Sequence, residues 1–160
     1  MTDLARFKIA QDSPAGFDQA LREIRGGGKR SHWIWYIFPQ IAGLGMSFQS
    51  REYAIRDAAE AEAYLRDPLL FSRLSTITQA VRDRLTGSSA MDVTTLMGSG
   101  IDAQKLVSSL TLFGSVARRL GAAKGAEDLA ELADTAEQVL AVAESQGYPR
   151  CQFTLRQIER

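Results

Sequence analysis

The stretch AEDLAELADTAEQVLAVAES, residues 126–145, decides the fold class. Its apolar residues recur at intervals of three and four, which places them on one side of a helix and leaves the acidic residues on the other. A glycine and a proline follow within four residues and end the pattern. The stretch therefore predicts one long amphipathic helix. Its inward-facing positions are Leu129, Leu132, Ala133, Ala136, Val139, Leu140 and Ala143.

The same spacing recurs in other segments, and glycines or prolines separate them. We expect Pro68 to divide two helices, Asp102 to cap the helix that runs to Leu120, and Ser31 to cap a short one over residues 32–38. Valine and isoleucine are scattered and do not form alternating runs. The sequence thus predicts a mainly α fold, a single globular domain over residues 1–160 with about seven helices. The further segments are residues 17–24, 58–67, 69–85, 90–97 and 153–158.

Composition and charge exclude several classes of protein. The chain has 160 residues, with 19 Lys and Arg against 19 Asp and Glu, so no global field favours nucleic acid or an anionic membrane. Cys151 is the single cysteine, which rules out an internal disulfide and fits a reducing compartment. The first residues do not resemble a secretory signal, and no stretch has the ~20 apolar residues of a membrane-spanning helix. We therefore expect a cytoplasmic protein with no membrane partner, and we do not expect nucleic-acid binding.

The segment KRSHWIWYIFPQIAGLGMSFQSREY, residues 29–53, gathers the aromatic residues. It contains both tryptophans, Trp33 and Trp35, and the only histidine, His32. Apolar residues are contiguous from Trp33 to Phe38, so a strand and a buried helix cannot be separated by periodicity alone. A segment this aromatic and this poor in charge forms either the centre of a core or the wall of a pocket.

A glycine-rich, basic run from Arg25 to Ser31 precedes that segment. Backbone N–H groups and a helix dipole at this place would favour an anion such as phosphate. The run lacks the spacing of a Walker motif, and no strand comes before it. Glycines after an amphipathic helix are equally typical of a helix stop, with the cations complementing the helix dipole. Both interpretations stay open.

A second polar group lies on the helix expected after Asp102. Lys105, Ser108 and Ser109 stand three and four residues apart and so share one side of that helix. Hydroxyl residues are poor helix formers, and they face either solvent or something polar such as a ligand. Zinc needs several histidines or cysteines, and the chain has one of each, so we predict no metal site and no cofactor.

His32 is the catalytic candidate, because it is the side chain that titrates near neutrality. Its neighbour Ser31 projects about 100° away on a helix, so the pair is poor support for a nucleophile and its base. A histidine hydrogen-bonded in or beside an aromatic core is the interpretation we favour over catalysis.

The run KRSHWIWYIFPQIAGLGMSFQSREYAI and the later KLVSSLTLF resemble the signature of the family named domain of unknown function eighteen-ten. The resemblance extends over nearly the whole chain and implies a mainly α-helical fold. It implies no established activity, so no catalytic residue is carried over. Some members bear the label calpastatin, but calpastatins are disordered inhibitors and this chain is patterned for a globular fold. Residues 121–146, rich in alanine and acids, and the tail YPRCQFTLRQI depart from the family pattern.

These observations predict a small-molecule site between the SHWIWYIFPQ segment and the Lys105 helix, with an anionic or phosphorylated ligand and with catalysis by His32 left open. The alternative is a protein-interaction module without chemistry, whose protein partner the sequence does not identify. A pocket of this kind places a few polar groups around apolar walls. The ligand-binding candidates are Lys29, Ser31, Trp33, Trp35, Gln40, Lys105, Ser108 and Ser109.

Overall fold

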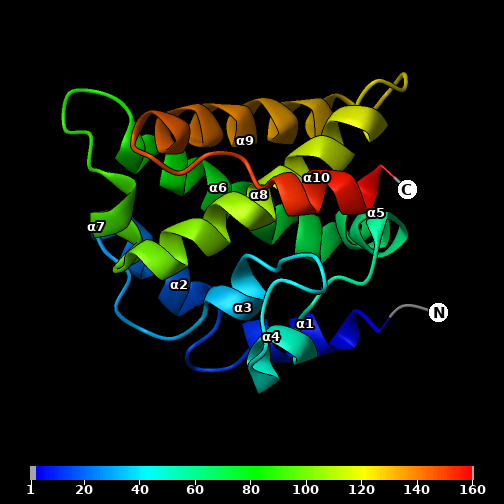
Figure 1. Ribbon diagram of the computed structural model, residues 1–160, viewed down its shortest axis with the longest axis horizontal. Coiled ribbons are helices and arrows are strands. Elements are labelled where there is room, and N and C mark those ends of the chain that lie inside the picture. Colours follow the sequence, from blue (N-terminus) through cyan, green and yellow to red (C-terminus); the bar gives the residue numbers. More distant parts are fainter. Residues whose placement is uncertain (1–2, 160) are drawn as a thin grey trace.

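The computed structural model describes residues 3–159, which form ten helices (Figure 1). Seven of these have seven or more residues, and three short ones lie in the connections between them. Within the described residues the chain has no strand and one isolated parallel bridge, between Ile41 and Ile55. The prediction of a mainly α fold is confirmed. The helices are α1 Ala5–Gln11, α2 Phe17–Arg25, α3 Ile34–Ile37, α4 Phe48–Glu52, α5 Ala58–Arg66, α6 Pro68–Leu85, α7 Val93–Met97, α8 Gly100–Leu120, α9 Glu127–Ser145 and α10 Gln152–Ile158.

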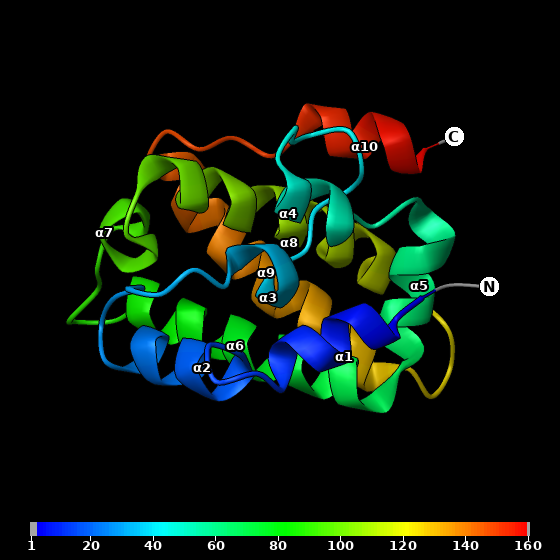
Figure 2. The ribbon, with the colours of Figure 1, turned by 90° about the horizontal axis from the view of Figure 1, so that it is seen from below.

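Helix α8 is the centre of the fold. It packs against α3, α5, α7, α9 and α10, and α9 also packs on α6 (Figures 1 and 2). A helix with neighbours on several sides buries more than one stripe of side chains. Eleven residues of α8 are accordingly buried, and Ser108, Ser109 and Thr111 are among them. The hydroxyl groups that we expected on one face of this helix therefore lie inside the protein.

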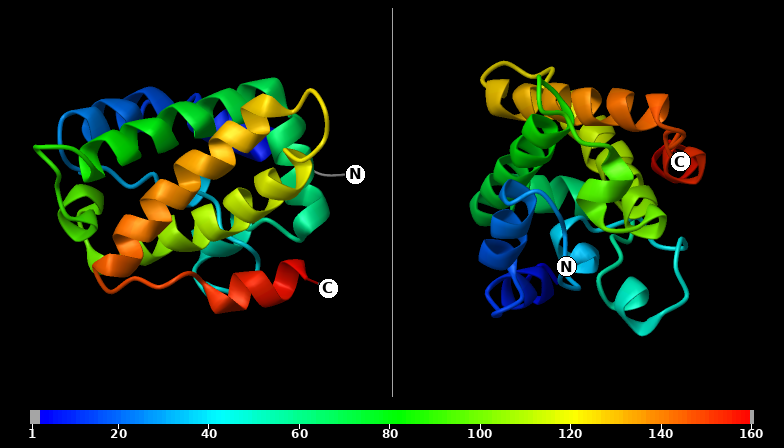
Figure 3. Two further views of the ribbon diagram at one scale, coloured as in Figure 1. Left: turned by 90° about the horizontal axis from the view of Figure 1, so that it is seen from above. Right: turned by 90° about the vertical axis from the view of Figure 1, so that its left-hand side faces the viewer.

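The long helix predicted over residues 126–145 is α9, and all seven of its predicted inward positions are buried. Its acidic residues are exposed, and the helix lies across α6 and α8 (Figure 3). Pro68 divides α5 from α6 as predicted, and the Asp67 side chain accepts hydrogen bonds from the N–H groups of Leu69 and Leu70. Among the described residues, no helix has both the length and the apolar character that crossing a membrane requires.

Two predicted helix caps were wrong. Helix α8 begins at Gly100, and its cap is Ser99, whose side chain accepts from the N–H of Asp102; Asp102 lies in the first turn. The short helix in the aromatic segment is α3, and it begins three residues after Ser31 and has no side-chain cap. Ser31 bonds another residue, described below. Both errors have one cause, because a Ser or Asp near a helix start can bond several neighbouring groups.

The segment from Trp33 to Ile55 forms the side of the molecule under α8. Helix α3 gives one turn of helix, and the chain then runs through a loop to α4. Two backbone hydrogen bonds close the loop, from Ala42 N to Ile55 O and from Ile55 N to Gln40 O, both 2.8 Å. Residues 40–55 are thereby attached to the core where the two ends of this segment meet, and Ile41 and Ile55 are buried there.

Candidate functional site

The glycine-rich run from Arg25 to Ser31 folds around the carboxylate of Glu23. One oxygen, Oε1, accepts from the backbone N of Arg30 at 2.7 Å, from the backbone N of Ser31 at 2.9 Å and from Trp33 Nε1 at 3.0 Å. The other, Oε2, accepts from Ser31 Oγ and from Gln19 Nε2, both at 2.6 Å. The backbone N–H groups that the sequence offered to an external anion are therefore occupied by the protein's own carboxylate.

This arrangement fixes the charge of Glu23. Burial by itself would raise the pKa of the carboxyl, but the hydrogen bonds from Ser31, Arg30 and Gln19 favour the ionised form, and the pKa of Glu23 is held far below its ordinary range. No cation among residues 3–159 forms an ion pair with the carboxylate, and the contacts that stabilise it are hydrogen bonds from neutral donors. Glu23 thus ties the loop, Ser31 and Trp33 to helix α2.

Lys29 is likewise bound within the protein. Its Nζ lies 2.8 Å from Asp102 Oδ2 on α8, donates to the carbonyl of Ser31 at 2.6 Å, and stands 5.0 Å from the centre of the Trp33 ring. The side chain is 6% exposed. A cation so enclosed, with a carboxylate partner, serves to attach the loop to α8 and is not available at the surface.

The two tryptophans have different surroundings. Trp33 is fully buried and its indole N–H donates to Glu23. Trp35 is half-buried, its indole nitrogen is buried without a hydrogen-bond partner, and Lys105 Nζ stands 5.0 Å from the centre of its ring. Trp33 is therefore a core residue, and Trp35 lies next to the surface under Lys105 of α8.

His32 and Gln40 belong to neither group. The His32 side chain is exposed and makes no hydrogen bond with a described residue, although its backbone carbonyl accepts from Tyr36 Oη at 3.3 Å. Gln40 is half-buried and its backbone carbonyl takes part in the bridge to Ile55. The structure thus gives these two predicted site residues no part in the contacts of Lys29 with Asp102 or of Lys105 with Trp35.

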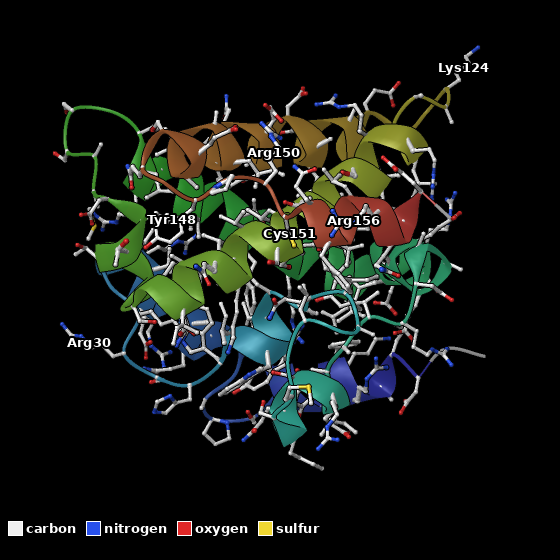
Figure 4. The ribbon with its side chains drawn as sticks, in the orientation of Figure 1. Arg30, Lys124, Tyr148, Arg150, Cys151 and Arg156 are labelled. Atoms are coloured by element: carbon white, nitrogen blue, oxygen red, sulfur yellow. The ribbon has the colours of Figure 1, made fainter. Side chains whose placement is uncertain are left out.

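A groove of about 290 Å³ runs along α8, and Lys105 is not among its lining residues. The chain between α9 and α10 forms one wall, and Leu44 from the loop before α4 contributes to another; Figure 4 shows Tyr148 and Cys151 on this side of the molecule. Ser108 lines the groove and is 8% exposed, while its neighbour Ser109 is fully buried and its Oγ has no hydrogen-bond partner among the described residues. The lining residues are Leu44, Gln104, Val107, Ser108, Gly147, Tyr148, Pro149 and Cys151.

Of the predicted site residues, Ser108 lines this groove, and the residues that face it were not among those predicted. No periodic pattern includes Tyr148, Pro149 and Cys151. At this place the sequence indicated only that the helix over residues 126–145 ends. The Tyr148 hydroxyl shares a hydrogen bond of 2.6 Å with Thr94 Oγ1, and the backbone N of Cys151 donates to Thr111 Oγ1 at 3.3 Å. These two bonds fix the wall of the groove to α7 and α8.

Another groove, of about 320 Å³, lies between α8, α9 and α10, and both its arginines are paired: Arg118 with Asp134 and Arg150 with Glu137, each at 2.6 Å. Among residues 3–159 no three His, Cys, Asp or Glu side chains gather closely enough to hold a metal ion. The predicted absence of a metal site and of a cofactor stays a prediction.

Comparison with known proteins agrees with the fold. The family described as Protein of unknown function (DUF1810) matches residues 1–137, and the chain belongs to this family. It is similar to the crystal structure of the conserved hypothetical protein Rv1873 from Mycobacterium tuberculosis, with 30% identity and a TM-score of 0.73 over 99% of this chain and 97% of that one. No curated protein matches. The matched family span contains Lys105 and Ser108, and Cys151 lies beyond it.

Proposed function

Because the family to which this chain belongs has no activity in its description, we propose a function from the site alone: the protein binds a small anionic molecule, such as a phosphorylated metabolite, on the side of α8 that carries Lys105 and Ser108. The observation that carries the proposal is the position of Lys105 on α8, three residues before Ser108, which lines the groove. Lys105 has no carboxylate partner among the described residues, and its ammonium lies 5.0 Å from the centre of the Trp35 ring.

The groove has the composition of a ligand site. Leu44, Val107 and Pro149 give apolar walls, and Gln104 and Ser108 add hydrogen-bonding groups among them. Lys105 and Ser108 stand one turn apart on α8, so the flexible lysine can reach the edge of the groove on the Ser108 side. An anionic group would bind the ammonium there, and the remainder of the ligand would lie against the apolar wall.

The remaining predicted residues would support this site indirectly. Lys29, Ser31 and Trp33 are occupied by Asp102 and Glu23, and they attach the aromatic segment to α8. Binding is the function proposed, and proton transfer by His32 stays a prediction from the sequence. The proposal therefore makes Lys105, Ser108 and Gln104 the residues that contact the ligand, with Trp35 beneath Lys105.

A thermal-shift screen against nucleotides, sugar phosphates and dicarboxylates tests the proposal. A ligand that binds only the native state raises the free energy of unfolding, by about 1.4 kcal/mol at ten times its Kd. We expect Lys105→Met to abolish the stabilisation. The matched control is Lys124→Met, which removes an exposed cation on the far loop between α8 and α9 (Figure 4). Stabilisation that survives Lys105→Met, or that Lys124→Met removes equally, would contradict the proposal.

A second candidate function, docking to another protein, has one observation in its favour. Met46, in the loop before α4, is 86% exposed, and Phe48, the first residue of α4, is 71% exposed. Single exposed apolar residues are normal, but large apolar residues that gather at the surface mark interaction sites. Replacing both with serine should abolish association with the protein's partner in a sedimentation assay and leave anion binding unchanged. A partner that binds the double variant equally well would remove this candidate.

A further inference from the structure

Helices α3 and α8, which pack against each other, each carry a buried polar atom without a hydrogen bond (Figure 2). These atoms are Trp35 Nε1 on α3 and Ser109 Oγ on α8, and neither has a partner among the described residues. Buried polar groups are nearly always hydrogen-bonded, because leaving one unpaired costs free energy. Two such atoms on a pair of packed helices therefore need an explanation.

Lys105 is a third polar group on these helices that lacks an acceptor. It is half-buried, and its ammonium stands 5.0 Å from the centre of the Trp35 ring. It precedes Ser109 by four residues, so both lie on the same side of α8. Asp102, one turn before Lys105, is already paired with Lys29 at 2.8 Å. No carboxylate among the described residues therefore balances the charge of Lys105.

The lysine and the indole cannot satisfy each other. An ammonium has three donors and no acceptor, and an indole N–H is a donor only. The ammonium lies over the face of the Trp35 ring, whereas the N–H points outward in the plane of the ring. A water molecule or an oxyanion would supply the missing acceptor, but only an oxyanion would also balance the charge of Lys105. The unpaired charge therefore favours the oxyanion.

We propose that the oxyanion bound by Lys105 also accepts a hydrogen bond from Trp35 Nε1, so that the ligand carries a group with at least two acceptor oxygens, a phosphate or a carboxylate. This rests on the proposed function and names the group that its site recognises. Each oxygen accepts at about 2.8 Å, one from the ammonium and one from the indole. The flexible lysine stem lets the ammonium move off the ring face and uncover the N–H.

Inorganic phosphate is the probe, and the two indole signals in a ¹H–¹⁵N spectrum report where it binds. Phosphate should move the Trp35 indole ¹H signal downfield until the site is saturated. Trp33 is the internal control and should not respond, because its N–H already donates to Glu23 at 3.0 Å. Sodium chloride at the same ionic strength should leave both signals in place. A Trp35 shift that chloride reproduces, or that Trp33 shares equally, would overturn the inference.

Trp35→Phe separates the N–H from the ring, since phenylalanine keeps an aromatic face under Lys105 and removes the donor. We expect phosphate binding, followed by the backbone N–H signals of α8, to weaken about tenfold, as the loss of one hydrogen bond to a charged group implies. The matched control is Tyr36→Phe, which removes a ring-borne donor of the same helix that bonds the Ala15 carbonyl at 2.6 Å. It should bind phosphate like the wild type. The wild-type titration needs no variant, so it decides the question even if Trp35→Phe does not fold.

Failure of this inference is distinguishable from failure of the proposed function. If phosphate moves the α8 signals, Lys105→Met abolishes the change and Trp35→Phe binds as tightly as the wild type, the anion binds at Lys105 without the indole and this inference alone is wrong. If phosphate moves none of these signals, the oxyanion site is wrong. The proposed function then stands only if an anion from the thermal-shift screen binds in a Lys105-dependent manner.

Discussion

Replacing Glu23 by glutamine should destabilise the protein substantially. In the wild type one carboxylate oxygen accepts three hydrogen bonds, from the backbone N–H groups of Arg30 and Ser31 and from the indole of Trp33. An amide oxygen in the same place keeps these bonds but loses their charge assistance, which is worth about 1 kcal/mol each. We therefore expect Glu23→Gln to lower the free energy of unfolding by about 3 kcal/mol at pH 7.

The effect depends on pH with a definite sign. The pKa of Glu23 is depressed in the folded protein, so its contribution is present above the unfolded pKa of about 4.3 and is lost as the pH falls below it. Between pH 7 and pH 3 the wild type should lose about 2 kcal/mol from this group, and Glu23→Gln should lose none from it. The difference between the two proteins therefore shrinks in acid.

Urea unfolding followed by circular dichroism at pH 7 and pH 3 measures both quantities. The control is Glu131→Gln, an exposed residue of α9 whose side chain makes no hydrogen bond in the described structure, and its effect should stay within about 0.5 kcal/mol. If Glu23→Gln also costs less than about 0.5 kcal/mol, or if its effect is as large at pH 3 as at pH 7, the role assigned to the Glu23 carboxylate is wrong.

Two further predictions concern a glycine turn and a buried hydroxyl group. Gly98→Ala should lower the free energy of unfolding more than Gly87→Ala. Both glycines have positive φ, but a Cβ at Gly98 would lie 3.0 Å from the Lys29 carbonyl oxygen, whereas one at Gly87 would meet no atom within 4 Å. Melting temperatures compare the two variants, and equal losses of about 1 kcal/mol would contradict a steric effect of the Lys29 carbonyl. Tyr64→Phe should lower the free energy of unfolding in urea by about 1 kcal/mol, because the fully buried Tyr64 hydroxyl accepts a hydrogen bond from Gln11 Nε2 at 3.1 Å. In the variant this amide keeps only its bond to the Tyr36 carbonyl, and a gain in stability would contradict the prediction.

Helices marked by a regular apolar spacing or by a proline were predicted well from the sequence. The α9 pattern and the break at Pro68 are local signals, and both helices form as expected because apolar spacing and proline geometry act within a few residues. The caps at Asp102 and Ser31 were wrong because a short polar side chain has several bonding partners nearby, and tertiary contacts select among them.

The site was harder to predict, since its residues meet only in the fold. Nothing in the sequence indicates that Glu23, on the polar side of an amphipathic helix, receives the N–H groups of a loop seven and eight residues later. Nor does any spacing bring Cys151 to Ser108. For the glycine-rich run the sequence left an anion site and a helix stop open, and in the structure its N–H groups bind the protein's own carboxylate.

The most direct test of the central claim, an anion site at Lys105, uses the two indole N–H signals in a ¹H–¹⁵N spectrum. Trp33 donates to Glu23 inside the core, and Trp35 lies under Lys105, so the first serves as an internal control for the second. Titration with an anionic ligand found in the thermal-shift screen should shift the Trp35 signal and leave the Trp33 signal in place, and Lys105→Met should abolish the shift. A titration that moves both signals equally, or neither, would contradict a ligand site at Lys105.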